Sequence, residues 1–361
     1  MSADSPRPAG PVEFRYTQTD SFVALLRELG ASLLVSTYQA NKLLALRAAG
    51  AGLSTLVRTF DRPMGIAVDG RQMALGTRGQ VWFYRDAPDI APRVEPAGVH
   101  DACYLPRTCH VTGDIGVHEL AWAGGELWVV NTRFSCLCTL SPAYSFVPRW
   151  RPPFVTGLSA DDRCHLNGLC VVGGRPRYVT ALGTTDTPGG WRADKPHGGC
   201  LIDVPTGEIL ARGLSMPHSP RWHNGRLWLL ESGTGWLLTA DADGRSEPVA
   251  EVAGFARGLC LAGRYAFVGL SKIRETSAMD GVPLAGRRKE LKCGVAAVDV
   301  RAGRIIGSLE FQTAVEEIFD VQLLPAVRFP EVVGFQQDTV NQTFVVPPGD
   351  NPVDHGPAGS K

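Results

Sequence analysis

Two histidines occupy matching positions in a repeated sequence pattern. His118 opens HELAWAGGELWVVN and His218 opens HSPRWHNGRLWLLE 100 residues later, with His, Trp, Gly, Leu and Trp in register. His165 lies between them, two residues before Asn167, which opens the weaker copy NGLCVVGGRPRYVTALG. Three convergent imidazoles suit Zn, Fe, Cu or Mn, and a metal held in this way can polarise a substrate oxygen or activate water. The pattern therefore predicts a divalent transition-metal site formed by His118, His165 and His218.

The same histidines have a purely structural explanation. A histidine that opens a strand can hydrogen-bond backbone carbonyls, and the match between two repeats can reflect the common ancestry of the repeats alone. For three histidines mapped to one place, both interpretations stay open.

Other polar residues occupy related positions in the repeats. Arg257 and Asp320 open two further strands, and Asn131 and Glu231 share an equivalent second-strand position. We expect Glu231 or Asp320 to act as a general base and Arg257 to bind an anion or an oxyanion. The residues expected to contact the substrate are Asn131, Asn167, Tyr38, Trp191, Lys272 and Arg274. For Tyr38 a polar turn, and for Lys272 and Arg274 a salt-bridged lid, remain alternative interpretations.

These residues must be positioned by an all-β scaffold. Units that begin near residues 64, 118, 167, 218 and 257 each contain a strand, a Gly turn, a second strand and two more strands. Four-stranded units repeating every 40–50 residues or so are typical of β-propeller blades. A sixth blade can be assembled from three N-terminal strands (SLLVSTY, KLLALRA, LSTLVRTF) and the C-terminal strand FDVQLLP. We therefore predict a six-bladed β-propeller closed by joining its two ends.

The remaining chain divides simply. We expect a single propeller domain over residues 13–346 with a short helix near 20–30, whose N-cap is Asp20 or Ser21. Residues 1–12 and 347–361 are rich in Pro, Gly, Ser and Asp and are expected to be flexible tails.

Long excursions are expected on one face of the propeller. They are residues 98–117, 157–165, 183–198 and 271–292, which we place at connections from a fourth to a first strand or from a second to a third strand. First-strand residues line the channel of a propeller, so Met64, His118, Asn167, His218, Arg257 and Asp320 should ring its mouth. Elaborated loops on one face of a rigid scaffold indicate a ligand or active site there.

Composition excludes several classes of function. Lys plus Arg number 36, as do Asp plus Glu, so no positive surplus favours nucleic-acid binding. No stretch of about 18 apolar residues is present, so we expect no membrane association. The start lacks the pattern of a secretory signal, and nine irregularly spaced cysteines do not suggest a disulfide framework, so we expect a cytoplasmic protein. No dinucleotide or P-loop motif occurs, so no nucleotide cofactor is expected.

The chain resembles a bacterial family of conserved hypothetical proteins, some of which are fused to tetratricopeptide repeats. The matching segments span residues 31–335 and include VSTYQANKLL, YLPRTCHVTGDIGVHELAW, DRCHLNGL, GLSMPHSPRWHNGRLWLLESGTG and EIFDVQLLP. More distantly, the architecture is similar to six-bladed lactonase and strictosidine-synthase-like propellers. Those lactonases hold a divalent metal through carboxylate and Asn ligands. His118 and His218 stand where oxygen ligands might be expected, which implies a softer metal here.

Two functions remain after this comparison. The first is a metal-assisted hydrolase, lyase or oxidoreductase that transforms a small polar molecule at the channel mouth. The alternative is a non-catalytic binding module that recognises a peptide or protein partner, to which the tetratricopeptide fusions lend some weight. A bound stoichiometric metal would distinguish them, and we favour the enzyme.

Overall fold

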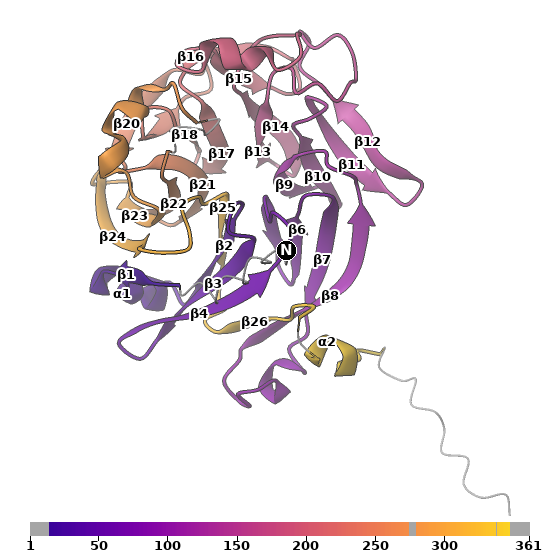
Figure 1. Cartoon of the computed structure of the whole chain (residues 1–361), viewed down its shortest axis with the longest axis vertical. Helices are drawn as coiled ribbons and strands as arrows, with labels where there is room; N and C mark the ends of the chain where they lie inside the picture. The colour runs from indigo at the N-terminus through magenta and orange to yellow at the C-terminus, as the bar shows by residue number, and fades with distance from the viewer. Residues whose placement is uncertain (1–13, 274–278, 337, 347–361) are drawn as a thin grey trace, which may run out of the picture.

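Six β-sheets surround a central channel in the computed structural model (Figure 1). The structure describes residues 14–273, 279–336 and 338–346. The sequence-based prediction of an all-β, six-bladed propeller is therefore confirmed. The predicted flexible tails, 1–12 and 347–361, lie outside the described residues.

Blade 1 joins the two ends of the chain, as predicted. Its innermost strand is β25 (Asp320–Leu324), which pairs antiparallel with β2 (Ser32–Thr37). The outer strands are β3 (Lys42–Ala49) and β4 (Gly52–Thr59). Every residue of β2 is buried, because this strand lies in the middle of its sheet and between two neighbouring blades.

The other five blades follow one another along the chain. Blade 2 consists of β5 (Ile66–Asp69), β6 (Gln72–Gly76), β7 (Gln80–Asp86) and β8 (Ala102–Val111). Blade 3 consists of β9 (Val117–Ala123), β10 (Glu126–Asn131), β11 (Cys136–Ser141) and β12 (Tyr144–Trp150). Blade 4 consists of β13 (Leu166–Val172), β14 (Arg175–Ala181), β15 (Gly199–Asp203) and β16 (Ile209–Leu214). Blade 5 consists of β17 (Pro217–His223), β18 (Arg226–Glu231), β19 (Trp236–Ala240) and β20 (Ser246–Glu251). Blade 6 consists of β21 (Phe255–Ala262), β22 (Tyr265–Ser271), β23 (Gly294–Asp299) and β24 (Arg304–Phe311).

Two short strands at the ends of the chain cover the outer edges of blades 6 and 2. β1 (Tyr16–Gln18) pairs antiparallel with β24, and β26 (Pro330–Val332) pairs parallel with β8. Arg47 Nη1 donates to the Pro330 carbonyl at 3.1 Å, and Arg58 forms a buried ion pair with Glu331. Both strands extend their sheets to five strands, and neither was anticipated from the sequence.

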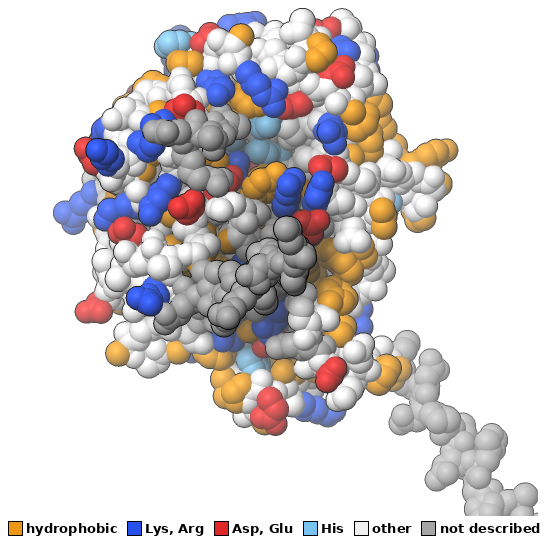
Figure 2. All heavy atoms as spheres, viewed as in Figure 1, with side chains coloured by type: hydrophobic (Ala, Val, Ile, Leu, Met, Phe, Trp, Pro, Cys, Tyr) orange, Lys and Arg blue, Asp and Glu red, His pale blue; other side chains and the backbone are white. Residues whose placement is uncertain are grey.

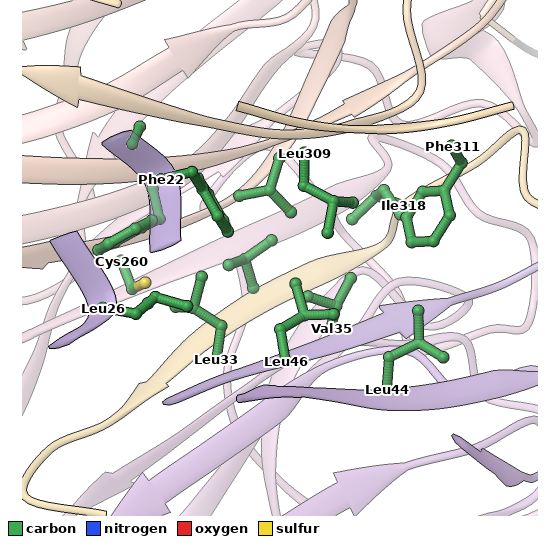
Figure 3. Close-up of a cluster of buried hydrophobic side chains, with 14 of the residues drawn as sticks. Phe22, Leu26, Leu33, Val35, Leu44, Leu46, Cys260, Leu309, Phe311 and Ile318 are labelled. Carbon is green, nitrogen blue, oxygen red and sulfur yellow. The ribbon is translucent and has the colours of Figure 1, made fainter. Parts of the chain in front are cut away.

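The predicted short helix is α1 (Asp20–Glu28), and it packs its apolar face on blades 1 and 6. Phe22 and Leu26 are fully buried against Leu46 and Leu309 in the cluster drawn in Figure 3. The N-cap is Thr19, not Asp20 or Ser21, because the Thr19 Oγ1 accepts a hydrogen bond from Phe22 N at 3.3 Å. A second, four-residue helix, α2 (Thr339–Gln342), follows β26.

Hydroxyl side chains connect successive blades near the mouth. Each lies at or just after the end of a second strand and donates to a backbone carbonyl of the next blade. These contacts are Ser36 to Met64 at 2.6 Å, Thr132 to Leu166 at 2.7 Å, Ser232 to Ala256, and Ser271 to Ile318 at 3.2 Å. They hold the inner strands of neighbouring blades in a fixed position relative to each other.

The excursions agree with the sequence expectation at three of four places. Residues 157–165, 183–198 and the described residues 272–273 and 279–292 lie between strands at the mouth. The second and third of these connections contain the 3-10 helices η2 (Gly190–Asp194) and η3 (Pro283–Glu290). The expected excursion 98–117 is wrong, since β8 occupies half of it. The long connection in blade 2 instead runs from 87 to 101, contains η1 (Ala91–Arg93) and joins a third to a fourth strand on the opposite face.

Candidate functional site

A cavity of about 350 Å³ lies at the mouth of the channel, and we call it the mouth cavity. Figure 2 shows histidine side chains in the hollow near the middle of this face. The residues lining it are Tyr38, Met64, Gly116, His118, Thr132, His165, Leu182, Trp191, Met216, His218, Phe255, Arg257, Met279, Glu317 and Phe319. The three histidines of the repeated pattern therefore meet in one cavity.

His165 presents one ring nitrogen to the cavity and anchors the other. Its Nδ1 lies 3.0 Å from a carboxylate oxygen of Asp162, which can only accept, so Nδ1 carries the proton. Trp191 packs against the ring in a tilted arrangement, with 4.4 Å between the centroids and 44° between the planes, and donates its Nε1–H to the same carboxylate at 2.9 Å. The backbone of His165 has φ of 51°, a left-handed conformation that non-glycine residues adopt at a cost. These contacts fix the orientation of the ring and engage its Nδ1.

His218 is held in the same way from blade 5. Its Nδ1 lies 2.9 Å from the Met216 carbonyl, an acceptor, which assigns the proton to Nδ1. Ser232 Oγ lies 2.9 Å from the same nitrogen and donates its own proton to the Ala256 carbonyl. Burial, with the charge of Arg257, lowers the pKa of His218 well below its usual range. The ring is therefore neutral near pH 7, with Nε2 unprotonated.

His118 lies between the other two rings. Its ring centroid is 5.2 Å from that of His165, 5.6 Å from that of His218 and 4.8 Å from that of Phe319. Its Nε2 is buried and has no hydrogen-bond partner among the described residues. Burial and the nearby positive groups lower the pKa of His118 well below its usual range, so the imidazole stays neutral. A buried polar atom without a partner is costly, and the residue that carries this one lines the mouth cavity.

Arg257 and Glu317 form an ion pair on the wall of the mouth cavity. Arg257 Nη2 donates to Glu317 at 2.6 Å, and the guanidinium carbon lies 4.0 Å from the Phe319 ring centroid. The Nε of Arg257 has no hydrogen-bond partner within the described part of the chain. The pair leaves the cavity wall without net charge, while one guanidinium N–H stays available to an oxygen atom of a ligand.

Five residues predicted for the site do not line the mouth cavity. Asn131 and Glu231 accept backbone or hydroxyl donors within turns, from Phe134 N at 3.0 Å and from Thr234 Oγ1 at 2.7 Å. Asn167 donates to the Pro217 carbonyl at 3.0 Å and so joins blades 4 and 5. The other two are Asp320 and Lys272.

Asp320 lies deeper in the channel than the mouth cavity. Phe319, immediately before β25, lines the mouth cavity, whereas the Asp320 carboxylate accepts from Ile66 N at 2.8 Å and lies 3.9 Å from Arg221. Of the remaining predicted substrate contacts, Tyr38 and Trp191 line the mouth cavity, and Arg274 lies outside the described residues.

A second polar cluster, not predicted, lies farther along the channel. Arg221 pairs with Glu119 and lies 3.9 Å from Asp320, and all three side chains are largely buried. Glu119 and Arg221 also line a second cavity, of about 390 Å³, at the turns between first and second strands. We call it the opposite cavity, because it lies at the other end of the channel from the mouth cavity. A β-bulge in blade 5 between His218 and Arg221 lets residues three positions apart both face the axis. The cluster thus separates the two ends of the channel.

The Glu119→Gln variant is expected to be less sensitive to pH than the wild type. Burial raises the pKa of Glu119 to about 7, because one guanidinium serves two buried carboxylates. The folded state then binds this proton more tightly than the unfolded chain, so the associated stability is present at low pH and is lost as pH rises through about 7. The difference in free energy of unfolding between wild type and variant, measured from about pH 5 to 8, should follow this trend.

The histidines have the opposite effect on stability. The lowered pKa of His118 and of His218 makes the folded protein lose stability as pH falls below the usual range of imidazole. Both histidines are present in wild type and variant, so their contribution cancels in the difference. A difference that does not vary with pH would contradict the assignment for Glu119.

The imidazoles offer some features of a metal centre. Metal-ligating histidines usually donate the second ring N–H to a carboxylate or a carbonyl, as His165 and His218 do. The centroid distances of 5.2 and 5.6 Å are near the separation of about 5 Å for imidazoles sharing one ion at about 2 Å from each nitrogen. Yet among the described residues no three or more His, Cys, Asp or Glu side chains are arranged so that they could hold a metal ion. The oxygen-rich metal site implied by the lactonase resemblance does not fit, because Asn131, Asn167 and Glu231 do not line the cavity.

One protein family matches most of the chain. The model of the domain of unknown function DUF4915 matches residues 20–333. The chain belongs to the DUF4915 family. The match spans the propeller from α1 to β26, so the family definition and the fold cover the same residues. No curated protein matches the DUF4915 chain in sequence.

Several solved structures share this architecture. A chain of the nidogen–laminin complex matches with a TM-score of 0.50 and 10% identity, over 82% of this chain and 99% of that chain. A periplasmic gluconolactonase from Pseudomonas aeruginosa matches with a TM-score of 0.44 and 14% identity, over 82% and 99% of the two chains. Virginiamycin B lyase from Staphylococcus aureus matches with a TM-score of 0.38 and 11% identity, over 72% and 96%. At these identities the likeness concerns the fold alone. None of the helices described in this DUF4915 protein has the length and apolar character needed to cross a membrane.

Proposed function

We propose that this protein is an enzyme that transforms a small molecule in the mouth cavity, with a transition metal held by His118, His165 and His218. The observation that carries the proposal is the buried, unpartnered Nε2 of His118 beside two histidines whose Nδ1–H groups are already engaged. Neutral imidazoles with an available Nε2 are the form in which histidine binds transition metals.

The surrounding residues would have distinct roles in this enzyme. A bound metal would supply Lewis-acid chemistry toward a substrate oxygen or water, as in hydrolases, lyases and some oxidoreductases. Asp162 orients the His165 ring through its Nδ1–H. Arg257 would donate its available N–H to a substrate oxygen. The Tyr38 and Trp191 rings would contact the body of the substrate and exclude water.

A second candidate is acid–base catalysis without a metal. The observation that favours it is the His165–Asp162 contact, since a carboxylate that holds Nδ1–H leaves Nε2 as a general base. Under this alternative His118 and His218 would bind the substrate through their ring nitrogens.

The size of the mouth cavity argues for a small molecule and against the peptide-binding module. Pockets for small ligands typically have volumes of about 300–1,000 Å³, and the mouth cavity falls in this range with about 350 Å³. A folded partner or a peptide would need a longer groove than this cavity provides.

Elemental analysis combined with an untargeted turnover assay tests the proposal. The purified, untagged protein is incubated with a bacterial metabolite extract, before and after removal of metal with a chelator, and the extract is compared by mass spectrometry. We expect about one transition-metal ion per chain and the consumption of a metabolite that stops after chelation. Turnover that persists without metal would support the acid–base candidate, and a bound but unchanged ligand would support the binding module.

A further inference from the structure

Three methionines line the mouth cavity together with the three histidines. They are Met64 before β5, Met216 before β17 and Met279 before η3. The chain has five methionines in all, so most of its thioethers meet at this one cavity. Met64 and Met216 are also fixed to the site through their backbones, because the Met64 carbonyl accepts from Ser36 and the Met216 carbonyl accepts from the His218 ring.

The donor atoms available in the mouth cavity are soft. No cysteine lines it, and the one carboxylate that does, Glu317, is paired with Arg257 at 2.6 Å. Side chains of His, Cys, Asp and Glu alone do not form a metal-holding group in the described parts of the chain, so any complete site needs a donor of another kind. Thioether sulfur atoms are such donors, and each of the three methionine side chains is at most 7% exposed.

Ligand chemistry then selects the metal. Thioethers bind copper(I) well, whereas Mg²⁺, Ca²⁺ and Mn²⁺ prefer oxygen donors. Imidazole nitrogen is compatible with copper, and copper(I) needs only two or three donors. The apolar neighbours Leu182, Phe255 and Phe319 suit an ion of low charge, since a doubly charged ion would lose more hydration free energy in the same surroundings.

We infer that the mouth cavity is a copper(I) site, in which one or more methionine thioethers complete the set begun by His118, His165 and His218. This inference rests on the metal in the proposed function and names its identity. It assigns Met64 and Met216 a role as ligands, in addition to their contribution to the apolar wall.

Competition titration with copper(I) tests the inference on the full-length, metal-free chain. Copper(I) is delivered without oxygen in the presence of the chelator bicinchoninate, and zinc(II) is titrated in parallel. We expect one copper(I) per chain, bound more tightly than zinc(II). The Met64→Leu/Met216→Leu double variant should lower copper(I) affinity by about tenfold or more and leave zinc(II) affinity unchanged. Leucine nearly preserves side-chain volume, so the fold should be retained.

Met73→Leu is the matched control, because Met73 is fully buried in β6 and does not line the mouth cavity. It should leave copper(I) affinity unchanged, and X-ray absorption should show sulfur around copper in wild type and less sulfur in the double variant. Equal copper(I) affinity in wild type and double variant, or tighter binding of zinc(II), would overturn the inference. Binding of zinc, iron or manganese that depends only on the histidines would do so while leaving the proposed function intact. If no metal binds at all, the metal part of both proposals fails.

Discussion

The His118→Ala/His218→Ala double variant is expected to lose its bound metal and its turnover. Two of the three imidazoles disappear, and His165 with the remaining donors of the mouth cavity cannot retain a transition metal against dilution. We expect the metal content to fall from about one ion per chain to below about a tenth of that value. Elemental analysis of the purified variant measures the loss, and the turnover assay on metabolite extract measures its consequence.

The matched control for this experiment is His197→Ala. The His197 side chain is 75% exposed and lies beside Asp194 on the loop between β14 and β15, so it should affect neither metal content nor turnover. The folded state of the double variant is checked by its unfolding transition. A folded double variant that retains stoichiometric metal would show that the histidines are structural.

Arg221→Met is expected to destabilise the protein more than any other single charge removal discussed here. The substitution leaves Glu119 and Asp320 buried without their guanidinium, and breaking a buried ion pair in this way typically costs about 3–5 kcal/mol. The burial of Asp320 already raises its pKa, which shows how costly its charge is in this position. Denaturant unfolding, read from the midpoint at constant slope, measures the loss.

Two comparisons separate this effect from a general effect of losing an arginine. Arg149→Met removes an exposed pair with Glu126 and should cost less than about 1 kcal/mol. Glu119→Gln introduced into the Arg221→Met background should restore part of the stability, because it removes one of the two unpaired charges. A cost for Arg221→Met similar to that for Arg149→Met would contradict the assigned role of the cluster.

The number of blades and the closure of the ring could be predicted because both follow from the regular spacing of the strands along the sequence. Apolar runs separated by Gly turns recur in each blade, and three strands at the start require one at the end. The strands β1 and β26 could not be predicted, because three residues carry no usable alternation and their pairing depends on distant partners. The extent of β8 was missed for a different reason, since its sequence ACYLPRTCHV contains a proline and several polar residues.

The site was only partly predictable. The repeated pattern correctly indicated that His118 and His218 lie close together, because equivalent positions in equivalent blades face the same channel. The position of Glu119 was missed, because in a regular strand the residue next to His118 would face away from the axis. The pairing of β9 with β10 has an irregular register, which the sequence pattern does not predict. Glu231 was expected to act as a general base from its second-strand position, yet it ends β18 outside the mouth cavity, where its carboxylate accepts from Ser215 N at 3.1 Å.

The strands β1 and β26 bear on how long a folded molecule survives. Blade 1 is the seam of the ring, and the two blades beside it each carry a strand from one end of the described chain. Opening the seam therefore requires that β25 separate from β2 while β1 or β26 leaves a neighbouring sheet, together with the buried Arg58–Glu331 pair. Such an event has a high activation barrier even when the net free energy of unfolding is ordinary. We therefore expect the added strands β1 and β26 to confer resistance to proteases over hours rather than a high melting temperature.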